Sequence, residues 1–185
     1  MQSRRGLIAG VVLFVAVLGA YWYFSPHLVL YRMQQAAING DPDGVNDHID
    51  YPALRESMRG QMAAVMTDKM SELKDNPFAA LGGMMAIAMV NQLVDSMVRP
   101  EVMANAMTTG RLKRAEGPAA TASSDAAGDK PQRVHWSLER KGADRVIARP
   151  KDEQGVVDAN VPGFVFERRG FADWKLTEIR LPPLK

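Results

Sequence analysis

The strongest pattern along the chain is an apolar run near its start. Residues 7–24 carry no charged side chain. At about 1.5 Å per helical residue the run is roughly 27 Å long, close to the hydrocarbon thickness of a bilayer. It predicts a transmembrane helix, with residues 1–24 forming a cytoplasmic tip and membrane anchor. The predicted anchor residues are Leu7, Val11, Phe14, Leu18 and an interfacial aromatic belt of Tyr21, Trp22 and Tyr23.

A cleaved signal peptide is the alternative interpretation of this run. Its apolar stretch would be shorter and would end in two small residues around the cleavage site. Leu18 stands where a small residue should precede Ala20, so an uncleaved anchor is favoured. Arg4 and Arg5 precede the run and favour a cytoplasmic N-terminus. We therefore expect a single-pass protein of a bacterial inner membrane with its body in the periplasm.

Proline and glycine divide the segment that follows into helices. Ser25-Pro26 predicts the start of a helix, because proline in a first turn gives up an N–H that has no helical partner. Gly40 is placed to end it in the left-handed conformation. Asp41-Pro42 predicts the cap and first turn of a short second helix, which should end near residue 50.

A third helix, over residues 52–74, has the clearest helical periodicity. Its apolar positions recur every three or four residues and are dominated by methionine. Two interpretations stay open: a face buried in the core, or an adaptable surface for a partner or an apolar ligand. The candidate surface comprises Met58, Met62, Met66 and Met70, with Met84, Met85 and Met89 of the next segment.

Residues 78–98 are apolar enough to raise the question of a second membrane span. Their aliphatic and aromatic side chains contribute about −3 kcal/mol to insertion, whereas Asp95 alone costs about +2.5 to +3.5 kcal/mol. We expect instead a helix buried on most sides. A helix lying at the membrane interface is the alternative. A last short helix is predicted over residues 101–108.

The second half of the chain changes to a strand-like period. Residues 111–132 are rich in Ala, Ser, Gly and Pro and read as a flexible linker. Residues 133–185 alternate in hydrophobicity and predict an antiparallel meander, including a strand at 156–161 and a bulge near Thr177-Glu178. The fold class is α+β: three to five helices, in a helical region spanning residues 25–110, covering a curved sheet of four to five strands.

No pattern of catalytic or metal-binding residues is visible. The chain has no cysteine, and its three histidines stand apart without ligand spacing. Lys and Arg number 23 against 21 Asp and Glu, so the charge excess of a nucleic-acid binder is missing. We expect no enzyme activity, no cofactor, no metal and no nucleic-acid partner. Asp50 is expected to pair with Arg55 at the start of a helix.

The residues after the anchor resemble a bacterial family called domain of unknown function 2939. The resemblance implies membrane-anchored proteins whose helices precede a curved sheet, similar to the cone of the nuclear-transport-factor-like fold. It implies no reaction. The matching positions, which we interpret as structural, include Ser25, Pro26, Asp50, Tyr51, Pro52, Leu54 and Arg55.

Two functions of different classes are compatible with these features. The first is a non-enzymatic inner-membrane protein that serves as an accessory or assembly subunit of a larger integral membrane complex. The alternative is a periplasmic binding module or carrier for a lipid or another apolar ligand. The lipid bilayer is a partner in both.

Overall fold

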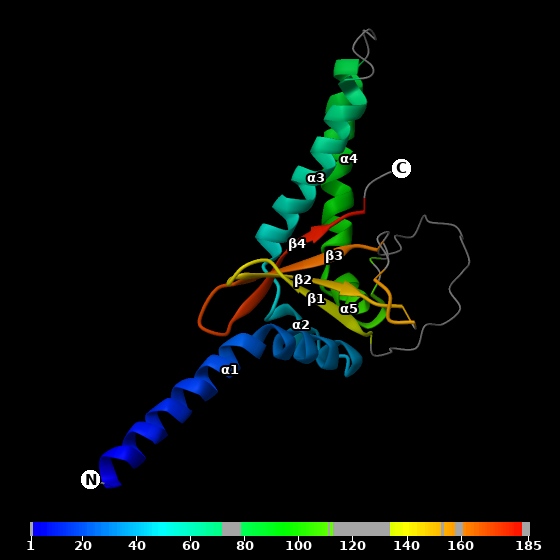
Figure 1. Ribbon diagram of the computed structural model, residues 1–185. Coiled ribbons are helices and arrows are strands. Elements are labelled where there is room, and N and C mark those ends of the chain that lie inside the picture. The colour runs from blue at the N-terminus through cyan, green and yellow to red at the C-terminus, as the bar shows by residue number, and fades with distance from the viewer. Residues whose placement is uncertain are drawn as a thin grey trace.

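A computed structural model describes residues 2–71, 79–110, 112, 134–152, 154–157 and 161–182, without the side chains of 2–6, 68–71 and 79–86. Within this part of the chain, five helices precede one four-stranded sheet (Figure 1), which confirms the α+β class. The predicted linker lies outside the described residues, except for Leu112. The helices are α1 (Gln2–Ile38), α2 (Pro42–Asn46), α3 (Tyr51–Ser71), α4 (Ala79–Met97) and α5 (Pro100–Thr109). The strands are β1 (Trp136–Arg140), β2 (Arg145–Pro150), β3 (Gly163–Arg168) and β4 (Trp174–Arg180).

Helix α1 continues through Pro26, so the prediction of a helix start there was wrong. Proline cannot donate to the carbonyl of Trp22, and its ring crowds that carbonyl. The Ser25 hydroxyl donates to the Trp22 oxygen instead, at 2.8 Å, and Arg140 donates to the Tyr23 oxygen at 2.6 Å. The helix bends where it reaches the rest of the molecule (Figure 1), as expected of a proline kink.

The turn into α2 follows the predicted capping pattern. Gly40 has φ of +69°, and the Asp41 side chain accepts a hydrogen bond from the Gly44 amide. The helix ends at Asn46, earlier than predicted. The reason is that the chain next pairs with β4: the Leu176 amide donates to the His48 carbonyl at 2.8 Å, and the Asp50 amide donates to the Leu176 carbonyl at 3.0 Å.

The sheet is an antiparallel meander in the order β1-β2-β3-β4. Opposite β4, Val165 pairs with Glu178 and Phe166 pairs with Leu176, so Thr177 is the additional residue of a bulge, as predicted. In the described part of the predicted strand at 156–161, only an isolated bridge between Lys151 and Val157 forms.

The core lies between one face of the sheet and the helices. The Thr177 bulge allows β4 to bury Trp174, Leu176 and Ile179 completely. These side chains belong to the same cluster as residues of all five helices, which cover the inner face. The outer face carries charged side chains, and its cross-strand ion pairs include Arg145 with Glu167 and Arg149 with Glu139.

Helices α3 and α4 run side by side and project away from the sheet; we call this projection the arm (Figure 1). Its base is packed: Val90, Val94 and Val98, along one side of α4 and just after its end, are buried. Near the middle of α4, Ile87 and Met89 are 60% and 66% exposed. The prediction that this helix is buried on most sides was therefore wrong, because only its C-terminal half reaches the body.

Candidate functional site

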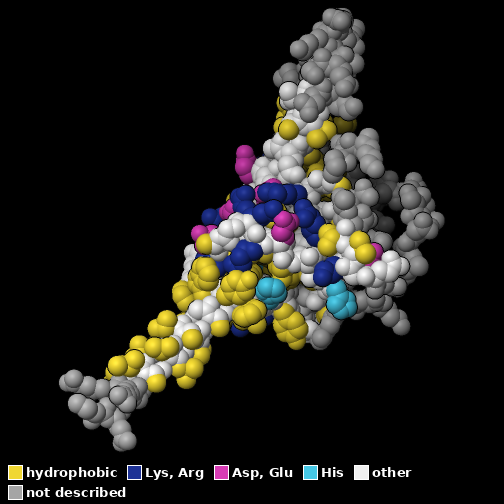
Figure 2. All heavy atoms as spheres, viewed as in Figure 1, with side chains coloured by type: hydrophobic (Ala, Val, Ile, Leu, Met, Phe, Trp, Pro, Cys, Tyr) yellow, Lys and Arg dark blue, Asp and Glu magenta, His cyan; other side chains and the backbone are white. Residues whose placement is uncertain are grey.

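Two surfaces of the described residues are candidates for function: the apolar surface of α1 and the exposed side of the arm. Helix α1 is long and apolar enough to cross a membrane, as a span or as a signal sequence. Figure 2 shows its hydrophobic side chains along the projecting segment. Six of the seven predicted anchor residues are exposed, and Trp22 is half-buried. The exposed six are Leu7, Val11, Phe14, Leu18, Tyr21 and Tyr23.

The apolar surface of α1 meets the body at a junction that is built around one arginine. The Arg168 guanidinium lies between two indole rings, with its Cζ atom 4.0 Å from the centre of Trp22 and 4.4 Å from that of Trp174. Burial lowers the pKa of Arg168, and the Asp144 carboxylate 3.2 Å away acts in the opposite direction. A guanidinium in such a place stays protonated, so this is a fixed cationic link between β3 and α1.

Ser25 forms a second link at the same junction. Its hydroxyl accepts a hydrogen bond from Trp174 Nε1 at 2.8 Å while it donates to the Trp22 carbonyl. Ser25 is only 2% exposed, so these hydrogen bonds are shielded from water. This position, noted at first for its resemblance to a family motif, thus joins the apolar helix α1 to the sheet.

The second group of motif residues joins α3 to its neighbours. Asp50 accepts from the Ala53 amide at 3.1 Å as an N-terminal cap, and its other carboxylate oxygen accepts from Arg169 at 3.1 Å. Arg55 instead lies 3.5 Å from Asp95 and donates to the Val98 carbonyl at 3.3 Å. The expected pair of Asp50 with Arg55 was therefore wrong, because Arg55 turns toward α4.

The remaining motif residues have structural places as well. Leu54 is completely buried in the core, and Pro26 is buried beside the junction. Tyr51 is half-buried and donates to the Asn46 side chain, which closes the turn between α2 and α3. Pro52 is exposed in the first turn of α3.

The predicted methionine surface is divided by the structure. Met58 is completely buried in the core, Met62 and Met66 are half-buried against it, and Met89 is exposed. The side chains of Met70, Met84 and Met85 lie outside the described residues. Met58 keeps no accessible surface, so it packs the core and does not line a ligand cavity.

The arm leaves three large apolar side chains exposed: Val65 of α3, and Ile87 and Met89 of α4. Ile87 and Met89 are two positions apart, so they lie on different sides of α4. Between these side chains and the body, Asp95 of α4 lies 3.2 Å from Arg59 of α3. That ion pair is exposed and contributes little to stability.

Sequence reasoning missed three residues beside α1: Arg140, Arg168 and Phe171. All three lie at the end of the sheet that faces α1, on strand ends or turns. The sequence did contain one signal, since Phe171 follows Gly170 in a hairpin turn, where polar residues are the rule. The two arginines gave none, because their partners lie more than a hundred residues away.

The comparisons with known proteins agree with the resemblance noted in the sequence. The model of a family described as a protein of unknown function (DUF2939) matches residues 15–106, from the anchor to α5. The chain resembles this family, and the match contains the Ser25 and Asp50–Arg55 positions. No curated protein and no solved structure matches the chain. The expected similarity to a nuclear-transport-factor-like cone stays a prediction.

Proposed function

We propose that the protein is a non-enzymatic, single-span protein of a bacterial inner membrane that acts as an accessory or assembly subunit of a larger membrane complex. In this proposal α1 stays in the bilayer, the body lies in the periplasm, and the arm contacts the partner. The expectation that no reaction is catalysed is part of the proposal.

The observation that carries the proposal is the pair of exposed apolar surfaces on separate projections. Helix α1 supplies one, and the exposed side chains of Val65, Ile87 and Met89 on the arm supply the other. Large apolar side chains that stay exposed on a projection cost solubility unless they are covered. Methionine suits such a surface, because its flexible thioether adapts to the partner.

Site-specific cross-linking tests the contact. The photoreactive amino acid p-benzoylphenylalanine replaces Met89 in the full chain in cells, and the matched control carries it at Val156, which is 58% exposed on the loop before β3. Adducts with a membrane protein are expected from Met89 and not from Val156. A chain that forms no adduct at Met89 and purifies in mild detergent as a free monomer would overturn the proposal.

A further inference from the structure

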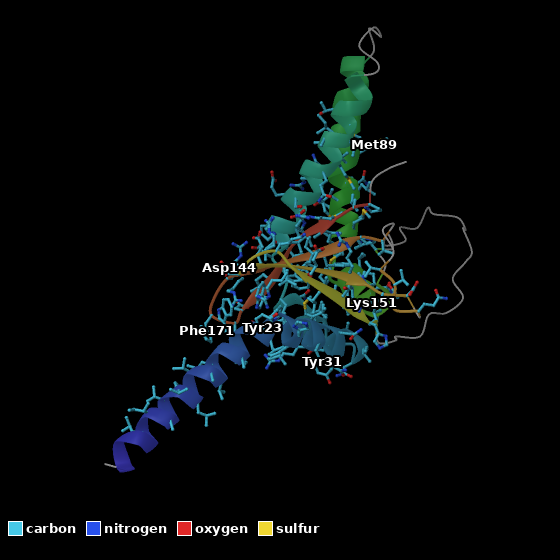
Figure 3. The ribbon with its side chains drawn as sticks, viewed as in Figure 1. Tyr23, Tyr31, Met89, Asp144, Lys151 and Phe171 are labelled. Atoms are coloured by element: carbon cyan, nitrogen blue, oxygen red, sulfur yellow. The ribbon has the colours of Figure 1, made fainter. Side chains whose placement is uncertain are left out.

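The turn between β3 and β4 presents an aromatic side chain beside the predicted span. Phe171 is 59% exposed, and its ring stacks on that of Tyr21, with 6.5 Å between centroids and 23° between planes. Tyr21 belongs to the aromatic belt predicted for the membrane interface. Figure 3 shows Phe171 and Tyr23 where α1 meets the sheet. The apolar surface of α1 thus continues onto the body through this ring.

The turn is held in this position by the arginine of the junction. Arg168 donates to the Phe171 carbonyl at 2.6 Å and to the Ala143 carbonyl at 3.1 Å, which ties the two turns at this end of the sheet together. Its guanidinium is stacked between Trp22 and Trp174 at the same time. The exposure of Phe171 is therefore a fixed feature, because the backbone that carries it is bonded to a buried group.

We propose that the β3–β4 turn is a second membrane contact, in which Phe171 enters the interfacial region of the phospholipid bilayer that holds α1. The inference rests on the proposed function in one respect, that α1 remains in the membrane. The partner is lipid because the ring adjoins Tyr21 of the span, and a bilayer that covers one ring reaches the other. Aromatic side chains partition favourably into this region.

A second contact fixes how the body stands on the membrane. A single span leaves the whole molecule, with its body fixed to α1, free to rotate about the membrane normal and to tilt. With Phe171 seated beside the helix, the sheet end that carries the β1–β2 and β3–β4 turns faces the lipid. The loop before β3 and the arm then lie away from the bilayer.

Depth-dependent fluorescence quenching tests the contact in the full chain. The chain has no cysteine, so Phe171→Cys carries a single nitrobenzoxadiazole label in phospholipid nanodiscs that contain doxyl-labelled lipid. The matched control is Val156→Cys, with nearly equal exposure at the opposite end of the sheet. We expect quenching at position 171 at least about threefold stronger than at 156.

Two further labels separate the possible failures. Leu18→Cys reports whether α1 is inserted: quenching there without quenching at 171 overturns the second contact alone. If neither site is quenched, the membrane anchor of the proposed function fails as well. A label at Asp173→Cys leaves the Phe171 ring in place. Adding Phe171→Asp to this variant should reduce the quenching of the label at position 173 at least about twofold. Equal quenching with and without Phe171→Asp would overturn the role of Phe171.

Discussion

At the scale of single residues, Ser25 joins the apolar helix α1 to the sheet. Its hydroxyl serves Trp174 Nε1 and the Trp22 carbonyl together. Ser25→Ala leaves both groups buried without a partner, and each such loss costs about 1–3 kcal/mol. We expect a clear fall in the free energy of unfolding, measured by near-ultraviolet circular dichroism in detergent.

A double-mutant cycle separates this link from general packing damage. Trp174→Phe removes the donor together with part of the buried ring, and the share due to the hydrogen bond should be missing in the Ser25→Ala background, so the substitution should cost less there than in the unmodified chain. If the loss of unfolding free energy in the double variant equals the sum of the losses in the two single variants, the hydrogen bond contributes nothing to stability.

His48 gives the fold a dependence on pH. Burial lowers its pKa below the ordinary value of 6.5, and the positive charge of Lys175 lowers it further. The negative charges of Asp173 and Asp47 act in the opposite direction. The unfolded chain therefore takes up a proton at a pH where the folded chain does not. Stability is fully present above about pH 6.5 and falls as the pH drops below it. His48→Gln should flatten this decline in thermal unfolding, and an unchanged slope would contradict the assignment.

At the scale of elements, the sequence predicted those features of the sheet that depend on residues close together in the chain. Alternation in hydrophobicity located the meander, and the change of parity within β4 located the bulge at Thr177. Pro26 was misread because the Trp22 carbonyl that it leaves without a donor is bonded by the Ser25 hydroxyl, and Ser25 is itself held by Trp174, 149 positions away. Local rules contain no information about such a distant partner. The exposed part of α4 was misread for a similar reason: its composition resembles a buried helix, and only tertiary structure shows where the body ends.

The methionine periodicity of α3 left two interpretations open, and the two make different energetic predictions. Met58 is completely buried, so Met58→Ala should lower the free energy of unfolding by about 2–5 kcal/mol. Val65 is 39% exposed on the arm, and Val65→Ala should change stability by less than about 0.5 kcal/mol while weakening the partner contact. Chemical denaturation of both variants measures the difference. Equal losses would place Val65 in the core and remove it from the proposed surface.

At the scale of the whole molecule, the body lies between two projections, the apolar helix α1 and the arm. Figure 1 shows α1 and the arm leaving the body from different sides. The family match runs from residue 15 to residue 106, so it covers α1 from its fifteenth residue, the arm and their connection, but not the sheet. The sheet connects the two projections. Trp174 and Arg168 bind α1, and β4 packs on α3 of the arm.

This arrangement makes orientation in the membrane a decisive test. Arg4 and Arg5 precede the span, so the N-terminus should stay in the cytoplasm and the arm should reach the periplasm. In cells with a permeabilised outer membrane, an impermeant maleimide should label Met89→Cys at once and Ser3→Cys only after lysis. Because the chain has no other cysteine, each signal comes from one site. The reverse pattern would place the arm in the cytoplasm, and its partner would then have to present its contact surface on that side of the membrane.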